Sequence, residues 1–184
     1  MDDNYLTESM YHDGFNKALL NGFKKYGEGC PYFVETGSQY GDGIAYAAMT
    51  GFDKLFSCEL SERRYKYCVN RYKDYDNIYL HNATSVEALK LILPELDKKT
   101  FFWLDAHAEG GGVPTFEELD LIKEVSTEHT IMVDDVAVYF GDGSELERKL
   151  LEVNPEYTIE RWNTLWEEEG RVTPDGYTMV AYLS

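Results

Sequence analysis

The chain has 184 residues, and its 34 acidic and 17 basic side chains give a formal net charge of −17 at pH 7. This length suits one domain, which buries roughly 70% of the surface that its unfolded chain exposes. The acidity disfavours a nucleic-acid partner, because gripping phosphate backbones needs clustered Lys and Arg. The apolar runs fall short of the ~18 residues of a membrane span, and the N-terminus lacks a signal-peptide pattern. The 3 cysteines form no CxxC pair, which disfavours a disulfide framework or a cysteine zinc site, so we expect a cytoplasmic protein without membrane contact.

Short apolar runs alternate with amphipathic stretches along the chain, and no internal repeat or linker interrupts them. In chain order they predict helix 4–26, strand 31–35, helix 43–49, strand 54–59, helix 61–75, strand 77–82, helix 84–93, strand 100–107, helix 114–125, strand 129–136, helix 144–154, strand 157–162 and strand 176–183. Strands that alternate with helices make βαβ units, and hence a mostly parallel sheet covered on both faces. The last two strands have no helix between them, which implies one antiparallel strand near an edge.

A glycine-rich turn follows the first predicted strand, in the segment V-E-T-G-S-Q-Y-G-D-G-I at 34–44. Neither Gly37 nor Gly41 begins the G-x-G-x-x-G dinucleotide pattern, and no G-x-x-x-x-G-K-[ST] phosphate loop occurs, so a nicotinamide cofactor is disfavoured. Glu35 stands two residues before Gly37, and Glu59 ends the second strand 22 residues after it. A carboxylate at that strand end can accept both hydroxyls of a ribose. The pattern favours a nucleoside site over a turn that binds nothing and a carboxylate that is merely solvated.

Four segments, ETGSQYGDG, CELSE, FFWLDAH-x-x-GGG and IMVDDV, occur in this order within residues 31–140. They resemble the class I S-adenosylmethionine-dependent methyltransferases, and most closely the small FkbM/macrocin-type O-methyltransferase-like proteins. The resemblance implies an α/β, Rossmann-like sandwich with a seven-stranded, mostly parallel sheet of order 3-2-1-4-5-7-6 and an N-terminal helix. A single domain, 1–184, would then comprise an N-terminal helical segment (1–28), a cofactor-binding core (31–140) and a closing strand pair (157–183).

The same resemblance implies where S-adenosylmethionine binds. The residues that it places around the methionine part are Glu35, Gly37, Ser38 and Gly41, with Asp105 also in the cofactor set, and it places Glu59 at the ribose beside Leu60. Proteins of this kind usually show Gly-Asp after the third strand, where the Asp contacts the adenine amino group. Here the stretch is His81-Asn82-Ala83-Thr84, so Asn82, Ala83 or a backbone group is expected to take that place.

Three carboxylates follow the fourth and fifth predicted strands: Asp105, Asp134 and Asp135. The ends of neighbouring parallel strands meet beside the ligand crevice, where converging carboxylates repel one another unless a cation or a proton intervenes. Oxygen ligands of this kind suit Mg²⁺, and the pattern is similar to metal-dependent O-methyltransferases of the catechol and macrocin types. Adjacent strand residues point to opposite faces, so Asp134 and Asp135 can both bind a metal only if the strand has ended at Asp134. The alternative is that one of them caps a loop or pairs with a cation, while Asp105 acts electrostatically on the sulfonium.

His107 lies two residues after Asp105 and is a candidate general base for a sugar or phenol hydroxyl, because histidine exchanges protons near neutral pH. A structural loop histidine is the alternative. Asp105 and His107 are therefore the predicted catalytic residues. The acceptor pocket would come from the N-terminal helix, the flap of Gly110, Gly111 and Gly112, the loop 163–175, or the second subunit of a homodimer.

We expect an O-methyltransferase for a small hydroxylated acceptor, a sugar or a natural product, with S-adenosylmethionine as cofactor and Mg²⁺ as a candidate second one. The alternatives are a nicotinamide-dependent oxidoreductase and a non-catalytic module that binds a cofactor or a metal. A nucleic-acid methyltransferase is a further alternative, which the charge of the chain disfavours.

Overall fold

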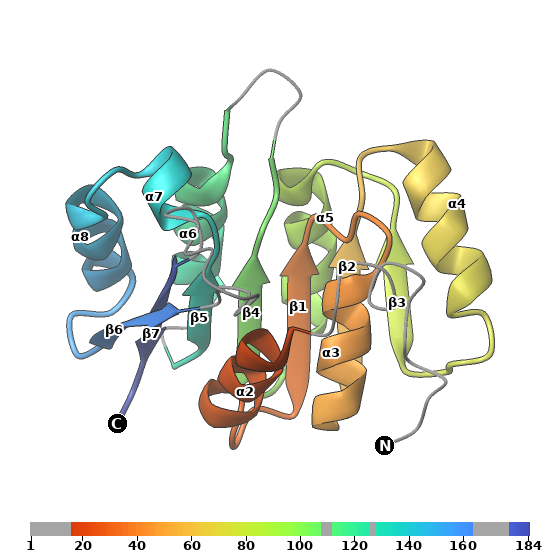
Figure 1. The fold of residues 1–184 in the computed structure, drawn as a ribbon, viewed down its shortest axis with the longest axis horizontal. Coiled ribbons are helices and arrows are strands. Elements are labelled where there is room, and N and C mark those ends of the chain that lie inside the picture. Colours follow the sequence, from red (N-terminus) through yellow and green to blue (C-terminus); the bar gives the residue numbers. More distant parts are fainter. Residues whose placement is uncertain (1–15, 108–111, 126–127, 164–176) are drawn as a thin grey trace, which may run out of the picture.

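The computed structural model describes residues 16–107, 112–125, 128–163 and 177–184. Its centre is one sheet in the order β3-β2-β1-β4-β5-β7-β6 (Figure 1). The strands are β1 (Tyr32–Thr36), β2 (Lys54–Cys58), β3 (Ile78–His81), β4 (Thr100–Leu104), β5 (Thr130–Val133), β6 (Thr158–Asn163) and β7 (Tyr177–Tyr182). Strands β1 to β5 pair in parallel, and β7 pairs antiparallel with both β5 and β6. The predicted sheet order and its antiparallel closing pair are confirmed.

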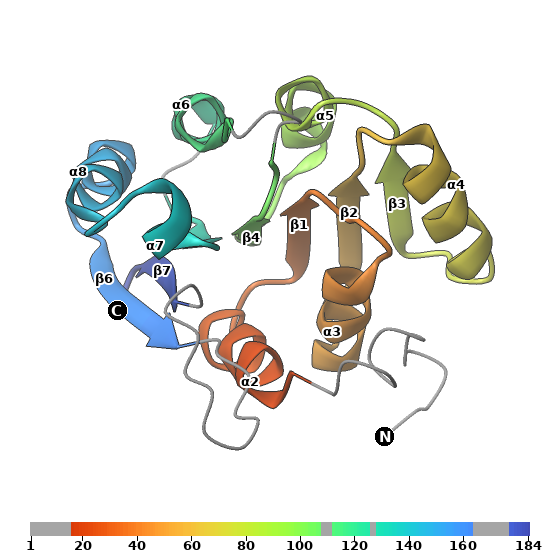
Figure 2. The ribbon, with the colours of Figure 1, turned by 45° about the horizontal axis from the view of Figure 1, so that its top comes forward.

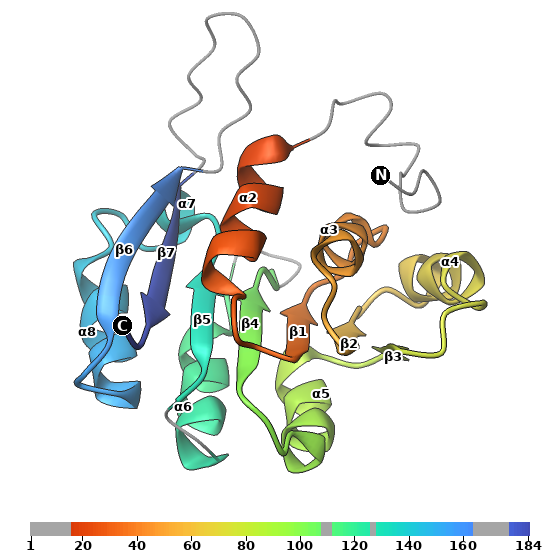
Figure 3. The ribbon, with the colours of Figure 1, turned by 90° about the horizontal axis from the view of Figure 1, so that it is seen from below.

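Helices cover both faces of this sheet (Figure 3). One face carries α2 (Lys17–Tyr26), α3 (Asp42–Thr50) and α4 (Glu62–Arg71), and the other carries α5 (Ser85–Ile92), α6 (Thr115–Val125) and α8 (Ser144–Val153). A 3-10 turn, η2 (Leu93–Glu95), follows α5, and a short helix, α7 (Val136–Tyr139), follows β5. Residues 4–15 of the predicted first helix lie outside the described residues. Within the described ranges, no helix is both long and apolar enough to cross a bilayer.

Strand residues alternate between two apolar clusters, one on each face of the sheet. Phe33 and Phe101 join a cluster with residues of α2 and α3, whereas Val34 and Phe102 join a cluster with residues of α5 and α6. On the first face, the ring of Phe23 in α2 lies 5.3 Å from that of Phe33. This double burial is why the central strands have almost continuous apolar sequences.

The carboxyl ends of the parallel strands share one edge of the sheet, and in Figure 2 the helices surround these strand ends. Glu59 follows β2, Asp105 follows β4 and Asp134 follows β5. Segments that are far apart in the sequence are thereby brought to one edge. This is the edge at which open α/β sheets bind their ligands.

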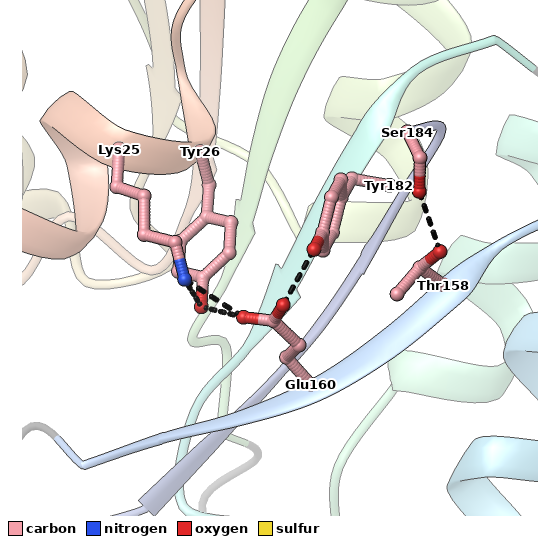
Figure 4. Close-up of polar contacts among 6 residues, drawn as sticks. All are labelled: Lys25, Tyr26, Thr158, Glu160, Tyr182 and Ser184. Atoms are coloured by element: carbon pink, nitrogen blue, oxygen red, sulfur yellow. Dashed lines mark hydrogen bonds and ion pairs between the residues drawn. The ribbon is translucent and has the colours of Figure 1, made fainter.

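Helix α2 is fixed to the closing strands by a polar cluster (Figure 4). Glu160 on β6 accepts hydrogen bonds on one oxygen from Lys25 Nζ, at 2.8 Å, and from the Tyr26 hydroxyl, at 2.5 Å. Its other oxygen accepts from the Tyr182 hydroxyl at 2.5 Å. Farther along β6, Trp162 Nε1 donates to a carbonyl of α2 at 3.0 Å. The cluster therefore sets the position of α2 relative to β6 and β7.

Candidate cofactor and acceptor cavity

A cavity of about 900 Å³ opens at the carboxyl edge of the sheet. Its walls come from the turn after β1, the ends of β2, β4 and β5, and the first turns of α3, α5 and α6. Helix α2 adds Leu19, and its N-cap residue Asn16 also lines the cavity. The volume lies in the upper part of the range for small-molecule sites, roughly 300–1,000 Å³.

The turn after β1 depends on a glycine with positive φ. Gly37 has φ +88°, and a Cβ there would lie 2.6 Å from the carbonyl oxygen of Asp105, so glycine alone fits against the end of β4. The amides of Gly37 and Ser38 both donate to the carbonyl of Cys58, over 3.0 and 2.8 Å, which fixes the turn to the end of β2. Gly37 and Ser38 line the cavity, whereas Gly41, the N-cap of α3, is not among its lining residues.

Glu35 lies on β1 with 2% of its surface exposed, and it lines the cavity beside the N-terminus of α3. The Ser57 hydroxyl donates to its carboxylate. A Cβ at Gly43 would overlap Glu35 Oε1, so Gly43 provides the room for this side chain. Burial raises the pKa of Glu35 to about 8, against the Ser57 hydrogen bond, which lowers it, and with the charge of Asp42, which adds to the rise. A neighbouring cation would keep Glu35 ionised at neutral pH, so the site suits an ammonium group.

Glu59 follows β2, and backbone amides hold its carboxylate in place. One oxygen accepts from the amide of Gln39 at 2.8 Å, and the other accepts from the amide of Ser61 at 2.7 Å. The side chain is buried and lines the cavity. Each carboxylate oxygen has a further lone pair, so Glu59 can still accept two hydroxyl groups of a ribose.

Asn82 lies next to the segment that carries Glu59. Its side-chain amide donates to the carbonyl of Glu59 at 2.8 Å and to that of Leu60 at 3.2 Å. Leu60 and Ala83 line the cavity, whereas Asn82 is not among the lining residues. The structure therefore offers Leu60 and Ala83 to a ligand, and Asn82 as a brace for the residues after β2.

Asp105, His107 and Asp135 converge on the other side of the cavity, with one ligand atom of each within 4.8 Å of the others. His107 Nε2 lies 3.2 Å from Asp135 Oδ2 and 3.7 Å from Asp105 Oδ1. Strand β5 ends at Val133, so Asp134 and Asp135 both lie beyond the strand, and Asp135 turns the chain at φ 51°. The strand has thus ended before both acids, as a shared metal site would require. Among the described residues, however, the side chains that converge are Asp105, His107 and Asp135, and Asp134 is not one of them.

The carboxylates at the ends of β4 and β5 hinder each other's ionisation. Burial, with the charges of Asp134, Glu35 and Asp135, raises the pKa of Asp105 well above its usual range, although 30% of that side chain is exposed. Burial and the charge of Asp135 raise the pKa of Asp134 to about 7. Negative charge at this end is therefore only partly compensated, and a bound cation would relieve it.

Several lining residues carry no clear sequence signal: Asn16, Leu19, Asp42, Tyr46, Arg64, Trp103 and Glu117. Tyr46 and Trp103 occupy apolar positions of a helix and a buried strand, where the pattern indicates only a core. Glu117 resembles an ordinary acid in the first turn of a helix, and the available signal is that this helix starts at the carboxyl edge. Gly112 of the predicted flap lines the cavity, while Gly110, Gly111 and the loop 164–176 lie outside the described residues.

Comparison with solved structures identifies the fold. An O-methyltransferase from Bacillus cereus in complex with SAH (S-adenosylhomocysteine) superposes with a TM-score of 0.68 at 15% identity, over 96% of this chain and 82% of that chain. The O-methyltransferase TomG from Streptomyces achromogenes, in complex with SAM (S-adenosylmethionine), gives 0.64 at 15% identity, over 96% and 86%. SAH-bound methyltransferase PaMTH1 from Podospora anserina gives 0.63 at 12% identity, over 100% and 82%. No protein-family model and no curated protein matches the sequence. The chain thus has the class I methyltransferase fold, as the resemblance of its motifs implies.

Proposed function

We propose that this chain is an S-adenosylmethionine-dependent methyltransferase that methylates a hydroxyl group of a small acceptor. The observation that carries the proposal is that two groups of residues line one cavity. Glu35 and Glu59, at the ends of β1 and β2, suit a cofactor, whereas Asp105 and His107, after β4, suit the reacting groups. Solved structures of the same fold are O-methyltransferases crystallised with SAM or SAH, which supports the same chemistry here.

The residues at the ends of β1, β2 and β3 would bind the cofactor. Glu59 would accept the ribose hydroxyls, and Glu35 would pair with the amino group of the methionine part. Leu60 and Ala83, which line the same cavity as Glu59, would contact the adenine. Gly37 and Ser38 would give the backbone its close approach to the sulfur, because neither side chain fills the turn.

The cofactor supplies a methyl group on a sulfonium, which is a good leaving group, so the chain has to orient the reactants and accept one proton. The acceptor oxygen forms a bond to the methyl carbon as the carbon–sulfur bond breaks. His107 takes the hydroxyl proton, and Asp135, 3.2 Å from its Nε2, stabilises the imidazolium. Asp105 faces the positive charge of the sulfonium. The products are a methyl ether and S-adenosylhomocysteine.

The group of Asp105, His107 and Asp135 also fits a divalent ion, since it offers two carboxylate oxygens and one imidazole nitrogen within 4.8 Å. Carboxylates suit Mg²⁺, and the imidazole also suits transition metals. An ion held there would lower the pKa of acceptor hydroxyls. His107 would then be a metal ligand instead of a general base. A test of whether magnesium binding requires Asp135 distinguishes these two roles of His107.

Calorimetric titration with S-adenosylhomocysteine tests the proposal. Wild type should bind it, and Glu59→Gln should bind it about tenfold or more weakly, because charge-assisted hydrogen bonds to the ribose are lost. Glu62→Gln, an exposed position at the start of α4, is the matched control and should bind as wild type does. Wild type that responds to NAD but not to S-adenosylhomocysteine would replace this proposal with an oxidoreductase.

Turnover separates an enzyme from a binding module. Labelled S-adenosylmethionine and a panel of hydroxylated sugars and phenols should give a methyl ether with wild type. His107→Ala should lower kcat with little change in the affinity for S-adenosylhomocysteine. Tight binding without transfer to any member of the panel would identify a non-catalytic cofactor-binding module.

A further inference from the structure

The side of the cavity formed by β4, β5 and α6 is strongly acidic. Four lining carboxylates stand there: Asp105, Glu117, Asp134 and Asp135. Among the described lining residues, the arginine and lysine side chains are represented by Arg64 alone, on α4. Helix α4 lies next to β3, on the other side of β1 from β4 and β5 (Figure 1). A ligand that reaches β4 and β5 therefore meets a group of acidic side chains, and a positively charged ligand would favour their ionised form.

Two of these four carboxylates are outside the group that surrounds His107. Within the described part of the chain, Glu117 and Asp134 form no ion pair with Lys, Arg or His; those of Asp105 and Asp135 are with His107. A divalent ion held by Asp105, His107 and Asp135 would likewise leave Glu117 and Asp134 unused. These two side chains are available to an incoming ligand in either case.

A further carboxyl group lies close to this side of the cavity. Glu118 is fully buried in α6, and among the described residues neither of its carboxylate oxygens has a hydrogen-bond partner. Its charge raises the pKa of Asp105, and the charge of His107 lowers the pKa of Glu118 itself. Within the described residues, five carboxyl groups thus lie on or close to this side of the cavity, and His107 is the basic side chain that lines it there.

Apolar and aromatic side chains complete the same cavity. Leu19 of α2, Tyr46 of α3 and Trp103 of β4 all line it. Aromatic rings pack against flat carbon skeletons and also attract cations. A wall of this kind beside carboxylates suits a ligand that has both a carbon ring and a positive charge.

We propose that the cavity selects a cationic acceptor, a hydroxylated compound that carries an amine, and that Glu117 and Asp134 determine this specificity. The inference deepens the proposed function and rests on it for the identity of the ligand as an acceptor. An ammonium close to either carboxylate gains Coulomb energy, whereas a carboxylate or phosphate on the acceptor is repelled by the same groups. The selection therefore combines attraction of one charge with rejection of the other.

Three catechols of matched size and different charge test the inference: dopamine (cation), 3,4-dihydroxyphenylethanol (neutral) and 3,4-dihydroxyphenylacetate (anion). Their dissociation constants are measured by calorimetry at low salt, on wild type loaded with S-adenosylhomocysteine. Dopamine should bind about tenfold or more tightly than the anion, with the neutral compound between them, and salt should narrow the ratio. Equal affinities, the reverse order, or no binding of dopamine overturns the inference.

Variants assign the selection to named side chains. Glu117→Gln and Asp134→Asn should each reduce the ratio of dopamine to anion affinity severalfold. Glu124 lies on α6, as Glu117 does, and is exposed but is not among the lining residues. The control variant Glu124→Gln should therefore keep the wild-type ratio of dopamine to anion affinity. A wild-type ratio in both cavity variants would show that these carboxylates do not select the ligand.

The same titrations without S-adenosylhomocysteine separate this inference from the proposed function. The carboxylates belong to the chain, so the order of the three probes should persist in the free protein. If S-adenosylhomocysteine fails to bind, the proposed function is wrong, and the order of the probes still decides whether the cavity selects for positive charge.

Discussion

Glu118 is an acid in the apolar core of α6. It is fully buried, and neither oxygen has a hydrogen-bond partner within the part of the chain that the structure describes, although the hydroxyls of Ser85 and Thr36 lie near enough to lower its pKa. Burial outweighs them and raises the pKa of Glu118 to about 7. A buried polar group without a partner costs roughly 1–3 kcal/mol, so Glu118 destabilises a helix face whose other buried residues are Thr115, Leu119 and Ile122.

Glu118→Gln should change how stability depends on pH. The carboxyl of Glu118 has a raised pKa in the folded state, so its contribution to stability is fully present below about pH 4.5 and is lost as the pH rises through about 7. The amide does not titrate. The free energy of unfolding of the variant, minus that of wild type, should therefore increase by roughly 3 kcal/mol between pH 4 and pH 7.5.

Urea unfolding of both proteins across this pH range measures the difference. Glu117→Gln, the preceding residue, is exposed and serves as the control, with a much flatter difference. A constant difference between Glu118→Gln and wild type would mean that Glu118 is ionised in the folded protein at neutral pH.

Glu35 gives cofactor binding its own pH signature. In the free protein burial raises its pKa to about 8, so it is mostly protonated at pH 7. Pairing with the amino group of S-adenosylhomocysteine would ionise it, and binding at pH 7 should release about one proton. Calorimetry in phosphate and in Tris, which differ in ionisation enthalpy, measures this release. Equal heats in the two buffers would contradict the pairing, and Glu35→Gln should abolish the buffer dependence.

Sequence patterns could locate acids at strand ends but not the neighbours that give each acid its role. Glu35, Glu59 and Asp105 were predictable because a strand end is recognisable and carboxyl ends share one edge. Which of Asp134 and Asp135 approaches His107 depends on the turn at Asp135, where φ is 51°. No periodicity reports a dihedral angle of that kind. Glu117 and Glu118 form one acidic pair in the sequence, yet one side chain is exposed and the other is buried.

At the level of elements, α2 is held in place by contacts that join distant segments. Gly22 lies so close to β6 that a Cβ there would be 2.8 Å from Trp162 Nε1. The ring of Tyr26 meets that of Trp162 edge-on at 5.4 Å. The start of α2 is thereby fixed where Asn16 and Leu19 reach the cavity. The part of the cavity wall that Asn16 and Leu19 form, here called the acceptor wall, thus depends on a contact made at the far end of the helix.

Glu160→Gln should weaken this attachment. The carboxylate accepts hydrogen bonds from three side chains, and the neutral amide accepts them less strongly, so the loss of unfolding free energy should be about 1 kcal/mol. The pKa of Glu160 is lowered to about 2, chiefly by Lys25 and Tyr182. Its contribution is therefore present above about pH 4.5 and is lost as the pH falls toward 2.

Thr158→Val is the matched control for this variant, because Thr158 lies on the same strand and its hydroxyl bonds Ser184 at an exposed site (Figure 4). It should change stability little. Glu160→Gln should also weaken dopamine binding severalfold while affinity for S-adenosylhomocysteine stays near that of wild type. Equal weakening of both ligands would mean that α2 supports the whole cavity and not the acceptor wall.

The order of elements was predictable, whereas their ends were less so. Strand–helix alternation and the final strand pair predicted a mostly parallel sheet with one antiparallel strand near an edge, whereas the strand order came from the resemblance of the motifs to a known family. The predicted strand 129–136 ends in the structure at Val133, and α7 begins at Val136. Local apolar residues such as Val136 and Val138 suit either a strand or a helix. The Asp134 amide still donates to the carbonyl of Leu104 on β4, and the positive φ of Asp135 then turns the chain into α7.

At the scale of the whole molecule, a net charge of −17 destabilises the folded state through self-repulsion. Salt screens this repulsion, so sodium chloride should raise the melting temperature of every variant by a similar amount. A site-bound ion acts differently, because it stabilises the folded state according to its own dissociation constant. Comparing sodium chloride with magnesium chloride at equal ionic strength therefore separates general screening from binding of Mg²⁺ at a specific site.

Magnesium chloride should therefore raise the melting temperature of wild type more than sodium chloride does at the same ionic strength. The excess should persist in Asp134→Asn, since Asp134 is outside the group of Asp105, His107 and Asp135, and should vanish in Asp135→Asn. An excess of equal size in all three proteins would reflect divalent ions on the acidic surface, and His107 would then act as a base with no metal beside it. Loss of the excess in Asp134→Asn alone would assign the ion to the two adjacent aspartates at the end of β5.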